Sequence, residues 1–489
     1  MGEGGPVGQK LAIALAFGSS AAVMVLELVS LRLVAPYIGL TLETNTAVIG
    51  VALAAIATGA ALGGRFADVA PPQRTLGPLF LLAGALVMLV LPVVRWMGEA
   101  LRGGASELVF LVLAVTLFAP ASLLAAVTPM VTKLRLDTLA QTGTVVGRLS
   151  AYATVGGIVG TVLTGFVFVA TVPISTIVLT LGAALVVVGA ALTFLLRGVQ
   201  AAVKPVALAV VGATLTIVAP RPCEVETAYH CARIVADPNR ESGRTLYLDS
   251  ARHSYVDLKD PTYLEFEYIK SFAAAINGTW AEKQPLNALH VGGGGLTMTR
   301  YVTATRPGSK HQVYEIDPAV VELDKRELGV QTGPDLAVTV QDGRLGVRDE
   351  ETDSRDLVLM DAFSGLSVPW HLTTRELVAD VRRVLRPDGL YLVNVIDYGA
   401  AKFAKAEIKT VQAVFPYVAV IARKNELSGH SGGNFVVAAS DKPIDVPAIV
   451  GQLEPSMDVL DRPDGFVGDA PVLTDDYAPV DQLLTPYSG

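Results

Sequence analysis

The sequence contains little of what metal-binding, disulfide-rich and nucleic-acid-binding proteins need. Its 489 residues include two cysteines, Cys223 and Cys231, and six histidines, and none of them has the spacing of a zinc site. The net charge is −8, whereas binding to nucleic acid requires positive charge that neutralises phosphates. We therefore expect no metal ion and no nucleic-acid partner.

Charged residues are especially scarce in the first 220 residues, which are strongly apolar. This part carries 11 Lys/Arg and 7 Asp/Glu, so the remainder of the chain has a net charge of −12. The whole chain is 51% hydrophobic, with a mean hydropathy of +0.48. Apolar runs cover 11–37, 45–66, 75–97, 106–128, 151–171, 173–196 and 204–220, and most reach the roughly 20 residues of a spanning helix.

The expected organisation is a multi-pass α-helical membrane domain over 1–220, with about seven helices and the lipid bilayer as its partner, and a second domain over 221–489. The first run is too long for a cleavable signal peptide. Glycine pairs at helical spacing, such as Gly59 with Gly63 and Gly156 with Gly160, predict close helix packing in lipid. Arg32 lies near the end of the first run, where a charge indicates either structural pairing or the handling of a substrate or lipid.

One loop of the apolar half carries a recognisable motif. The stretch GALGGRFAD, with Arg65 and Asp68, resembles the loop between the second and third helices of major-facilitator transporters. A simpler interpretation is that Arg65 and Asp68 cap a helix at the membrane interface. The motif alone therefore does not predict transport.

The loop charges predict an orientation that depends on the seventh run. Basic residues fall in alternate loops, on the side of Lys10, which the positive-inside rule assigns to the cytoplasm. Seven spans would place the second domain outside the cytoplasm, and six would place it inside. Cys223 and Cys231 would form a disulfide outside and stay reduced inside. The sequence predicts a cell-membrane protein and leaves the side of the second domain open.

After residue 222 the pattern changes to alternating strands and helices. Buried parallel strands are expected at 289–291, 313–316, 338–340, 357–360 and 390–395, with helices around 296–305, 318–328 and 373–386. This alternation predicts a doubly wound, Rossmann-like α/β domain. Residues 245–258 predict a small β region ahead of it, and 435–439 a late strand.

Four glycines, Gly292–Gly295, follow the first of these strands. Glycine lets the backbone approach a ligand and adopt positive φ, although a tight turn would need it too. The run is neither a G-x-G-x-x-G motif nor a phosphate-binding loop. Glu315, Asp342 and Asp361 end the next three strands, so their carboxylates meet in one crevice. Together these residues predict a nucleoside site, although each acid alone would also suit a helix cap.

The residues GGGG, EID, Asp342-Gly343 and Asp361 in LVLMDAFSG resemble, in this order, the spermidine synthase (polyamine aminopropyltransferase) family. The resemblance covers roughly residues 224–440. The apolar first half, VPWHLTTREL and LTDDYAPVD resemble the transmembrane, transporter-fused branch of that family.

The resemblance implies roles for individual residues. Gly292, Gly293 and Gly294 would lie near the methionyl end of S-adenosylmethionine or its decarboxylated form, and Glu315 would bind the ribose. Asp342 with Gly343 would bind the adenine amino group, and Asp361 would be the catalytic acid–base residue. Substrate-binding candidates, each also readable as an ordinary polar surface residue, are Tyr229, His230, His253, Ser364, Asp475 and Asp476.

Two departures from the family pattern affect the substrate. Gly295 replaces the acid of the family's glycine loop, and Ser364 with Gly365 replaces a second acid and a proline after Asp361. Those acids would bind the cationic amine, so putrescine as the acceptor is in doubt. Asp475 and Asp476 could substitute for them.

The expected chemistry is cleavage at the γ-carbon with release of methylthioadenosine. The nucleophile is either an external amine, as in spermidine synthesis, or a group of S-adenosylmethionine itself, which would close a ring. The alternatives are a methyltransferase, since the same fold serves both, and a non-catalytic sensor or transporter. The resemblance also implies a homodimer, because soluble members of the family pair.

Overall fold

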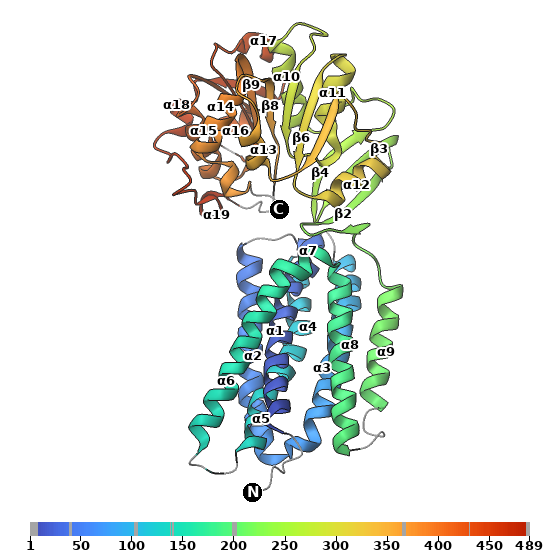
Figure 1. Ribbon diagram of the computed structural model, residues 1–489. Helices are drawn as coiled ribbons and strands as arrows, with labels where there is room; N and C mark the ends of the chain where they lie inside the picture. Colours follow the sequence, from blue (N-terminus) through green and yellow to red (C-terminus); the bar gives the residue numbers. More distant parts are fainter. Residues whose placement is uncertain are drawn as a thin grey trace. The chain divides into compact units, whose positions relative to one another are not determined.

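The computed structural model describes residues 8–38, 42–101, 106–136, 138, 141–197, 203–363, 368–429 and 431–485. The chain divides into two compact units, Met1–Cys231 and Ala232–Gly489, drawn in blue to green and in green to red in Figure 1. Each unit has its own hydrophobic core.

The first unit is a bundle of apolar helices, and each predicted apolar run lies in it. The helices are α1 (Gln9–Ile38), α2 (Leu42–Val69), α3 (Pro72–Ala100), α4 (Ser106–Ala125), α5 (Val127–Arg135), α6 (Thr142–Leu163), α7 (Val169–Thr171), α8 (Ile174–Arg197) and α9 (Val203–Val218), with a π-helical turn η2 (Thr164–Phe168) between α6 and α7. Within the described residues, six helical stretches are long and apolar enough to cross a membrane. The seventh, α9, has only 16 residues.

The glycine pairs bring helices together as predicted. A Cβ atom at Gly59 would overlap the backbone of Ser122 in α4, and one at Gly156 would overlap the backbone of Phe17 in α1. Small residues at these positions therefore let α2 approach α4 and α6 approach α1, and the prediction of close packing is confirmed.

The segment after α9 is bound to the helices of its own unit. Arg32 of α1 donates hydrogen bonds to the carbonyl oxygens of Thr227 and Tyr229. Of the two roles open to Arg32, the structure therefore shows a pairing one.

A buried ion pair adds a second anchor. Arg95 of α3 lies 3.1 Å from Oε1 of Glu226, in the short strand β1 (Val225–Glu226), while Oε2 accepts from the backbone N–H of Ser175. Cys223 and Cys231 form a disulfide in the same segment. This segment is thus fixed to the ends of α1 and α3 and to the start of α8.

The second unit begins with three antiparallel strands, β2 (Cys231–Asp237), β3 (Arg240–Leu248) and β4 (Ala251–Asp257). A larger sheet follows, with strand order β12-β10-β11-β9-β8-β5-β6-β7. Its strands are β5 (Asn287–Val291), β6 (Lys310–Glu315), β7 (Leu336–Val340), β8 (Arg355–Met360), β9 (Leu385–Asp397), β10 (Tyr417–Arg423), β11 (Gly433–Ser440) and β12 (Met457–Asp461). Strands β5 to β9 are parallel, as predicted, and β10 to β12 are antiparallel. The prediction that 338–340 is buried is wrong, because β7 is an edge strand and both Thr339 and Val340 are exposed.

Helices cover both faces of this sheet. They are α10 (Glu267–Thr279), α11 (Thr297–Thr305), α12 (Pro318–Glu327), α13 (Gly343–Asp349), α14 (Arg375–Val384), α15 (Lys402–Gln412), and the short α16 (Lys424–Leu427), α17 (Val446–Val450), α18 (Asp464–Val467) and α19 (Val480–Leu483). Alternate residues of β8 enter different cores, Leu357 and Leu359 on one face and Val358 and Met360 on the other. Burial on both faces explains why residues 357–360 of this strand are all apolar.

Candidate active site

The candidate site lies where the strand order of the large sheet reverses. From β5 the chain moves outward to β6 and β7, and then returns to β8 on the opposite side of β5. The carboxyl ends of β5 and β8 therefore border the crevice in which ligands of such sheets bind. Gly292 follows β5 and Asp361 follows β8, so the predicted loop and the predicted acid meet there.

Two glycines of the loop are required by its backbone. Gly292 has φ +96° and Gly295 has φ +73°, a region that side chains disfavour. A Cβ atom at Gly292 would overlap the carbonyl oxygen of Asp361, and one at Gly295 would overlap the hydroxyl of Ser254. The loop therefore lies directly against Asp361, with no side chain between them.

Two carboxylates accept hydrogen bonds from this loop. Gly293 N–H donates to Oε2 of Glu315 at 2.7 Å, and the other oxygen of Glu315 accepts from Asp317 N–H at 2.9 Å. Gly295 N–H donates to Oδ2 of Asp324 at 2.9 Å. Burial raises the pKa of Asp324 to about 8, so this side chain is protonated at neutral pH. Sequence reasoning missed Asp324, because a single acid inside a helix carries no signal.

Asp361 is held by two neutral donors. Asn394 Nδ2 donates to its Oδ1 at 2.9 Å, and the hydroxyl of Tyr268 donates to its Oδ2 at 3.0 Å. Asn434 in turn donates to Oδ1 of Asn394 at 2.9 Å. Burial raises the pKa of Asp361 to about 6, although both hydrogen bonds act to lower it. The carboxylate is thus ionised at pH 7 and has the proton affinity of a general base.

A cavity of about 40 Å³ lies between Asp361, the glycine loop and α10. His253 of β4 and Tyr268 of α10 line it together with Gly292 and Gly294. The structure therefore brings His253, one of the predicted substrate-binding candidates, beside Asp361. Among the described residues that line this cavity, Asp361 is the one with a carboxylate.

Two buried histidines adjoin this cavity. His290 of β5 lines it, and His290 Nε2 lies 3.0 Å from Nδ1 of His311. The second ring nitrogen of His311 lies 3.2 Å from the hydroxyl of Thr303. Burial lowers the pKa of His290 well below its usual value and that of His311 to about 4. Both rings are neutral at pH 7, so they add no positive charge to the site.

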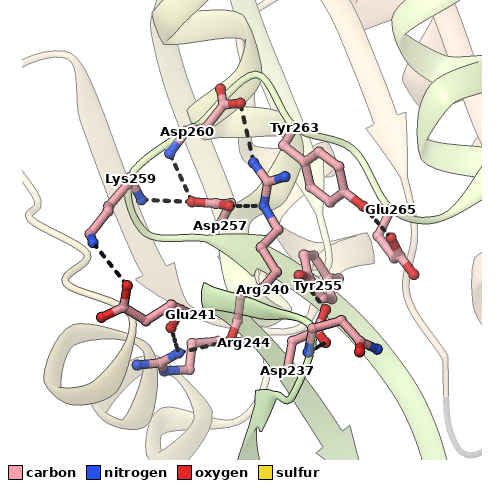
Figure 2. Close-up of polar contacts among 12 residues, drawn as sticks. Asp237, Arg240, Glu241, Arg244, Tyr255, Asp257, Lys259, Asp260, Tyr263 and Glu265 are labelled. Atoms are coloured by element: carbon pink, nitrogen blue, oxygen red, sulfur yellow. Dashed lines mark hydrogen bonds and ion pairs between the residues drawn. The ribbon is translucent and has the colours of Figure 1, made fainter.

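The strand β4 that carries His253 is braced by a polar network (Figure 2). Arg240 of β3 binds the carboxylates of Asp257 and Asp260, and its guanidinium carbon lies 3.8 Å from the ring centre of Tyr263. The hydroxyl of Tyr255 donates to Asp237 at 2.7 Å. We interpret this network as the support that fixes the hairpin beside the cavity.

Asp342 and its neighbours lie at the end of β7. Oδ1 of Asp342 caps α13 by accepting from the N–H groups of Arg344 and Leu345, and Oδ2 lies 3.0 Å from Nε2 of His371. Gly343 packs on the sheet, since a Cβ atom there would overlap Val291. Asp342 thus acts as a helix cap here, and His371 orients its second oxygen.

Asp475 is already paired. Its two oxygens lie 2.7 and 2.5 Å from the guanidinium of Arg344, and this bond holds the pKa of Asp475 below its usual value. Asp476 is exposed at the tip of a turn closed by hydrogen bonds between Thr474 and Tyr477. Neither acid lines the cavity that contains Asp361.

The remaining candidates lie elsewhere. Tyr229 and His230 belong to the first unit, where both backbone N–H groups donate to the hydroxyl of Thr227. Ser364 lies outside the described residues. The roles predicted for these three residues stay predictions.

No protein-family model matches the chain. It is 27% identical over 163 residues to the polyamine aminopropyltransferase of Vibrio vulnificus (strain CMCP6), covering 33% of this chain and 52% of that protein. It is 29% identical over 144 residues to the eEF1A lysine and N-terminal methyltransferase of Danio rerio, covering 28% of this chain and 21% of that protein. A crystal structure of a probable spermidine synthase from Corynebacterium glutamicum ATCC 13032 has 27% identity and a TM-score of 0.48, covering 53% of this chain and 96% of that one.

The similarities to the curated proteins are partial in extent. The chain spans about half the length of the Vibrio vulnificus polyamine aminopropyltransferase that it matches. A second polyamine aminopropyltransferase, from Chromobacterium violaceum, is 28% identical over 57% of its own length. The aligned part of the chain is thus similar to polyamine aminopropyltransferases over about half of their length.

Proposed function

We propose that the second unit binds S-adenosylmethionine or its decarboxylated form and cleaves the bond between sulfur and the γ-carbon, releasing methylthioadenosine. One observation carries this proposal. Asp361, with a pKa of about 6, lies directly against the glycine loop at the point where the strand order reverses. The similarity to polyamine aminopropyltransferases supports it.

The residues around the crevice suit a nucleoside with a positive charge on sulfur. The glycine loop leaves its backbone open to a ligand, and Glu315 keeps lone pairs that can accept from ribose hydroxyls. Asp342 at the next strand end would accept from the adenine amino group. The ionised Asp361 favours a nearby cation, while the neutral His290 and His311 do not oppose it.

The proposed reaction is a displacement at the γ-carbon. The lone pair of an amine forms the new C–N bond, the C–S bond breaks, and its electron pair stays on sulfur as the neutral thioether of methylthioadenosine. The proton lost by the nitrogen passes to the carboxylate of Asp361. Because sulfonium is a good leaving group, positioning supplies most of the remaining acceleration.

Two nucleophiles compete in this proposal. The curated relatives favour an external amine and therefore aminopropyl transfer. The cavity favours the substrate's own amine, because a diamine has two ammonium groups and Asp361 is the one carboxylate among the described lining residues. Asp475, which could have supplied a second carboxylate, is paired with Arg344. Ring closure of S-adenosylmethionine is therefore the second candidate.

One chromatographic experiment separates these reactions. The purified full-length protein is incubated with S-adenosylmethionine or its decarboxylated form, each with and without putrescine. Methylthioadenosine that requires the decarboxylated substrate and putrescine supports aminopropyl transfer. Methylthioadenosine from S-adenosylmethionine alone supports ring closure. S-adenosylhomocysteine would instead indicate a methyltransferase, and binding without any product would indicate a sensor.

We also propose that the first unit anchors this chemistry to a cell membrane, and its six candidate spans support this. Fractionation of cells followed by carbonate extraction would test the anchoring. The homodimer implied by the resemblance stays a prediction, which light scattering of the purified protein would test.

A further inference from the structure

The first unit contains a long apolar groove between α2 and α3. Its volume is about 910 Å³, and its walls include Leu62 and Phe66 of α2 and Leu79 and Leu82 of α3. Both helices pack on α4, which forms the floor, but in the described part of the chain they make hardly any contact with each other. The groove is therefore the space between α2 and α3, both of which pack on α4.

The shape of the groove follows from two glycines. Cβ atoms at Gly59 and Gly63 would overlap the backbones of Ser122 and Ala126, so α2 is pressed against α4 and the start of α5. Leu62 and Phe66 lie beside these glycines on the same face of α2, where they line the groove and are 56% and 51% exposed. Surfaces of this size and polarity are buried by a partner or by lipid.

One end of the groove is positively charged. Arg65, near the end of α2, and Arg74, in the first turn of α3, both line it, and both are exposed. Within the described residues neither arginine forms an ion pair, whereas the nearby Asp68 is paired with Lys133 at 2.8 Å. Two guanidinium groups beside an apolar groove match the phosphate and acyl chains of a phospholipid.

We propose that this groove binds a bilayer phospholipid with an anionic headgroup. Its acyl chains would lie along Leu62, Phe66 and Leu82, and its phosphate between Arg65 and Arg74. A zwitterionic lipid fits less well, because its own cation would meet the second arginine. The proposal rests on α2 to α5 lying in a membrane and is independent of the reaction proposed for the second unit.

The charge distribution of the bundle is consistent with this placement. Arg65 and Arg74 lie at the same end as Lys133 and Arg135, which the positive-inside rule assigns to the cytoplasm. Anionic lipids are concentrated in the cytoplasmic leaflet, and each basic residue near that surface strengthens their binding.

The test is lipid retention by the full-length protein in native mass spectrometry. The probes are phosphatidylglycerol and phosphatidylcholine with identical acyl chains. The double variant Arg65→Gln/Arg74→Gln removes the charge, and Arg135→Gln removes a basic residue at the same end that does not line the groove. Leu82→Trp fills the apolar part without changing the charge.

We expect the unmodified protein to retain phosphatidylglycerol about tenfold better than phosphatidylcholine. The double variant should lose this preference and Arg135→Gln should keep it, while Leu82→Trp should reduce retention of both lipids. Equal retention of the two lipids by the unmodified protein would overturn the proposal. So would an equal loss in Arg135→Gln and the double variant, which would indicate diffuse attraction rather than a site. Monodisperse elution and an unchanged melting temperature of each variant serve as the folding check.

Discussion

Two regions of the second unit carry carboxylates at strand ends, and they hold them differently. In the floor of the site, made of Gly292, Tyr268, Asp361 and Asn394, neutral hydroxyl and amide groups bind the carboxylate. The rim is made of Asp342, Arg344, His371 and Asp475. There the imidazole of His371 binds Asp342, and the guanidinium of Arg344 binds Asp475. Asp342 and Asp361 follow parallel strands, whereas Asp475 lies in the segment between α18 and α19. The two regions differ in burial as well as in partners, since burial raises the pKa of Asp361 whereas Asp475 is exposed.

This difference decides which carboxylate is suited to proton transfer and which to binding a ligand. A cationic partner stabilises the ionised form of a carboxylate, as Arg344 does for Asp475, whose pKa is lowered. Neutral donors in an enclosed site leave the proton affinity high, as for Asp361 with its pKa of about 6. The floor is therefore suited to accept a proton during a reaction, and the rim to hold a ligand in place.

The substitution Asp361→Asn should have the largest effect on turnover. It removes the proposed base while keeping the size of the side chain, so release of methylthioadenosine should fall by a factor of about 10² to 10⁴. Affinity for the nucleoside, measured by calorimetry, should change only a few-fold. Turnover within a factor of about ten of the unmodified protein would assign the base elsewhere.

Gly292→Ala should displace the backbone of the glycine loop from its position beside Asp361. The added methyl group would overlap the carbonyl oxygen of Asp361, at a position where φ is +96°. We expect nucleoside affinity to fall at least about tenfold, because the loop must move away from Asp361. Gly329→Ala is the matched control, since Gly329 also has positive φ (+67°) but no neighbouring atom within 4 Å. It should cost only about 1 kcal/mol of stability, measured by melting, and leave affinity unchanged. Similar losses of nucleoside affinity in both variants would mean that backbone strain, and not the contact with Asp361, causes the effect.

His371→Ala should weaken substrate binding at the rim and leave the chemistry at Asp361 almost unchanged. Without its imidazole, Oδ2 of Asp342 loses the partner that orients it toward a ligand. We expect KM to rise roughly tenfold while kcat stays within about a factor of two, because the lost contact acts on binding. A fall in kcat with constant KM would place His371 in the chemistry instead.

The smallest effect, visible only as a function of pH, should come from Asn394→Ala. The proposed base works as a carboxylate, so activity should rise with pH through about 6, the pKa of Asp361. The Asn394 hydrogen bond lowers this pKa, so its loss should move the rising limb to higher pH. Activity should fall several-fold at pH 6 and little at pH 8. Tyr268→Phe should shift the limb in the same direction, whereas His371→Ala should leave it in place.

The sequence predicted the position of a site residue where an acid follows a single apolar strand. Glu315, Asp342 and Asp361 each follow an apolar run, and the parallel arrangement of those runs brings their backbones to one edge. Tyr268 and Asn394 could not be found this way, because they reach Asp361 from 93 and 33 residues away and follow no motif. Asp324 was missed for the same reason.

Secondary structure was predicted best for uniformly apolar strands and least for short or late elements. The helix α13 has only seven residues, and β12 has only five and is mostly half-buried, so neither gives a strong periodic signal. In the first unit the apolar runs predicted the helices, while the break between α4 and α5 and the turn η2 have no counterpart in hydropathy.

The disulfide bond between Cys223 and Cys231 indicates in which compartment this part of the chain lies. Disulfides persist only under oxidising conditions. Arg32, which binds the segment containing this bond, lies 22 residues along α1 from Lys10, about 33 Å away. If Lys10 faces the cytoplasm, this segment and its disulfide bond lie on the outer side of the membrane, and the nucleoside proposed as the substrate would reach the protein only by export. Labelling of the two thiols by an impermeant reagent only after reduction would confirm that the bond faces outward.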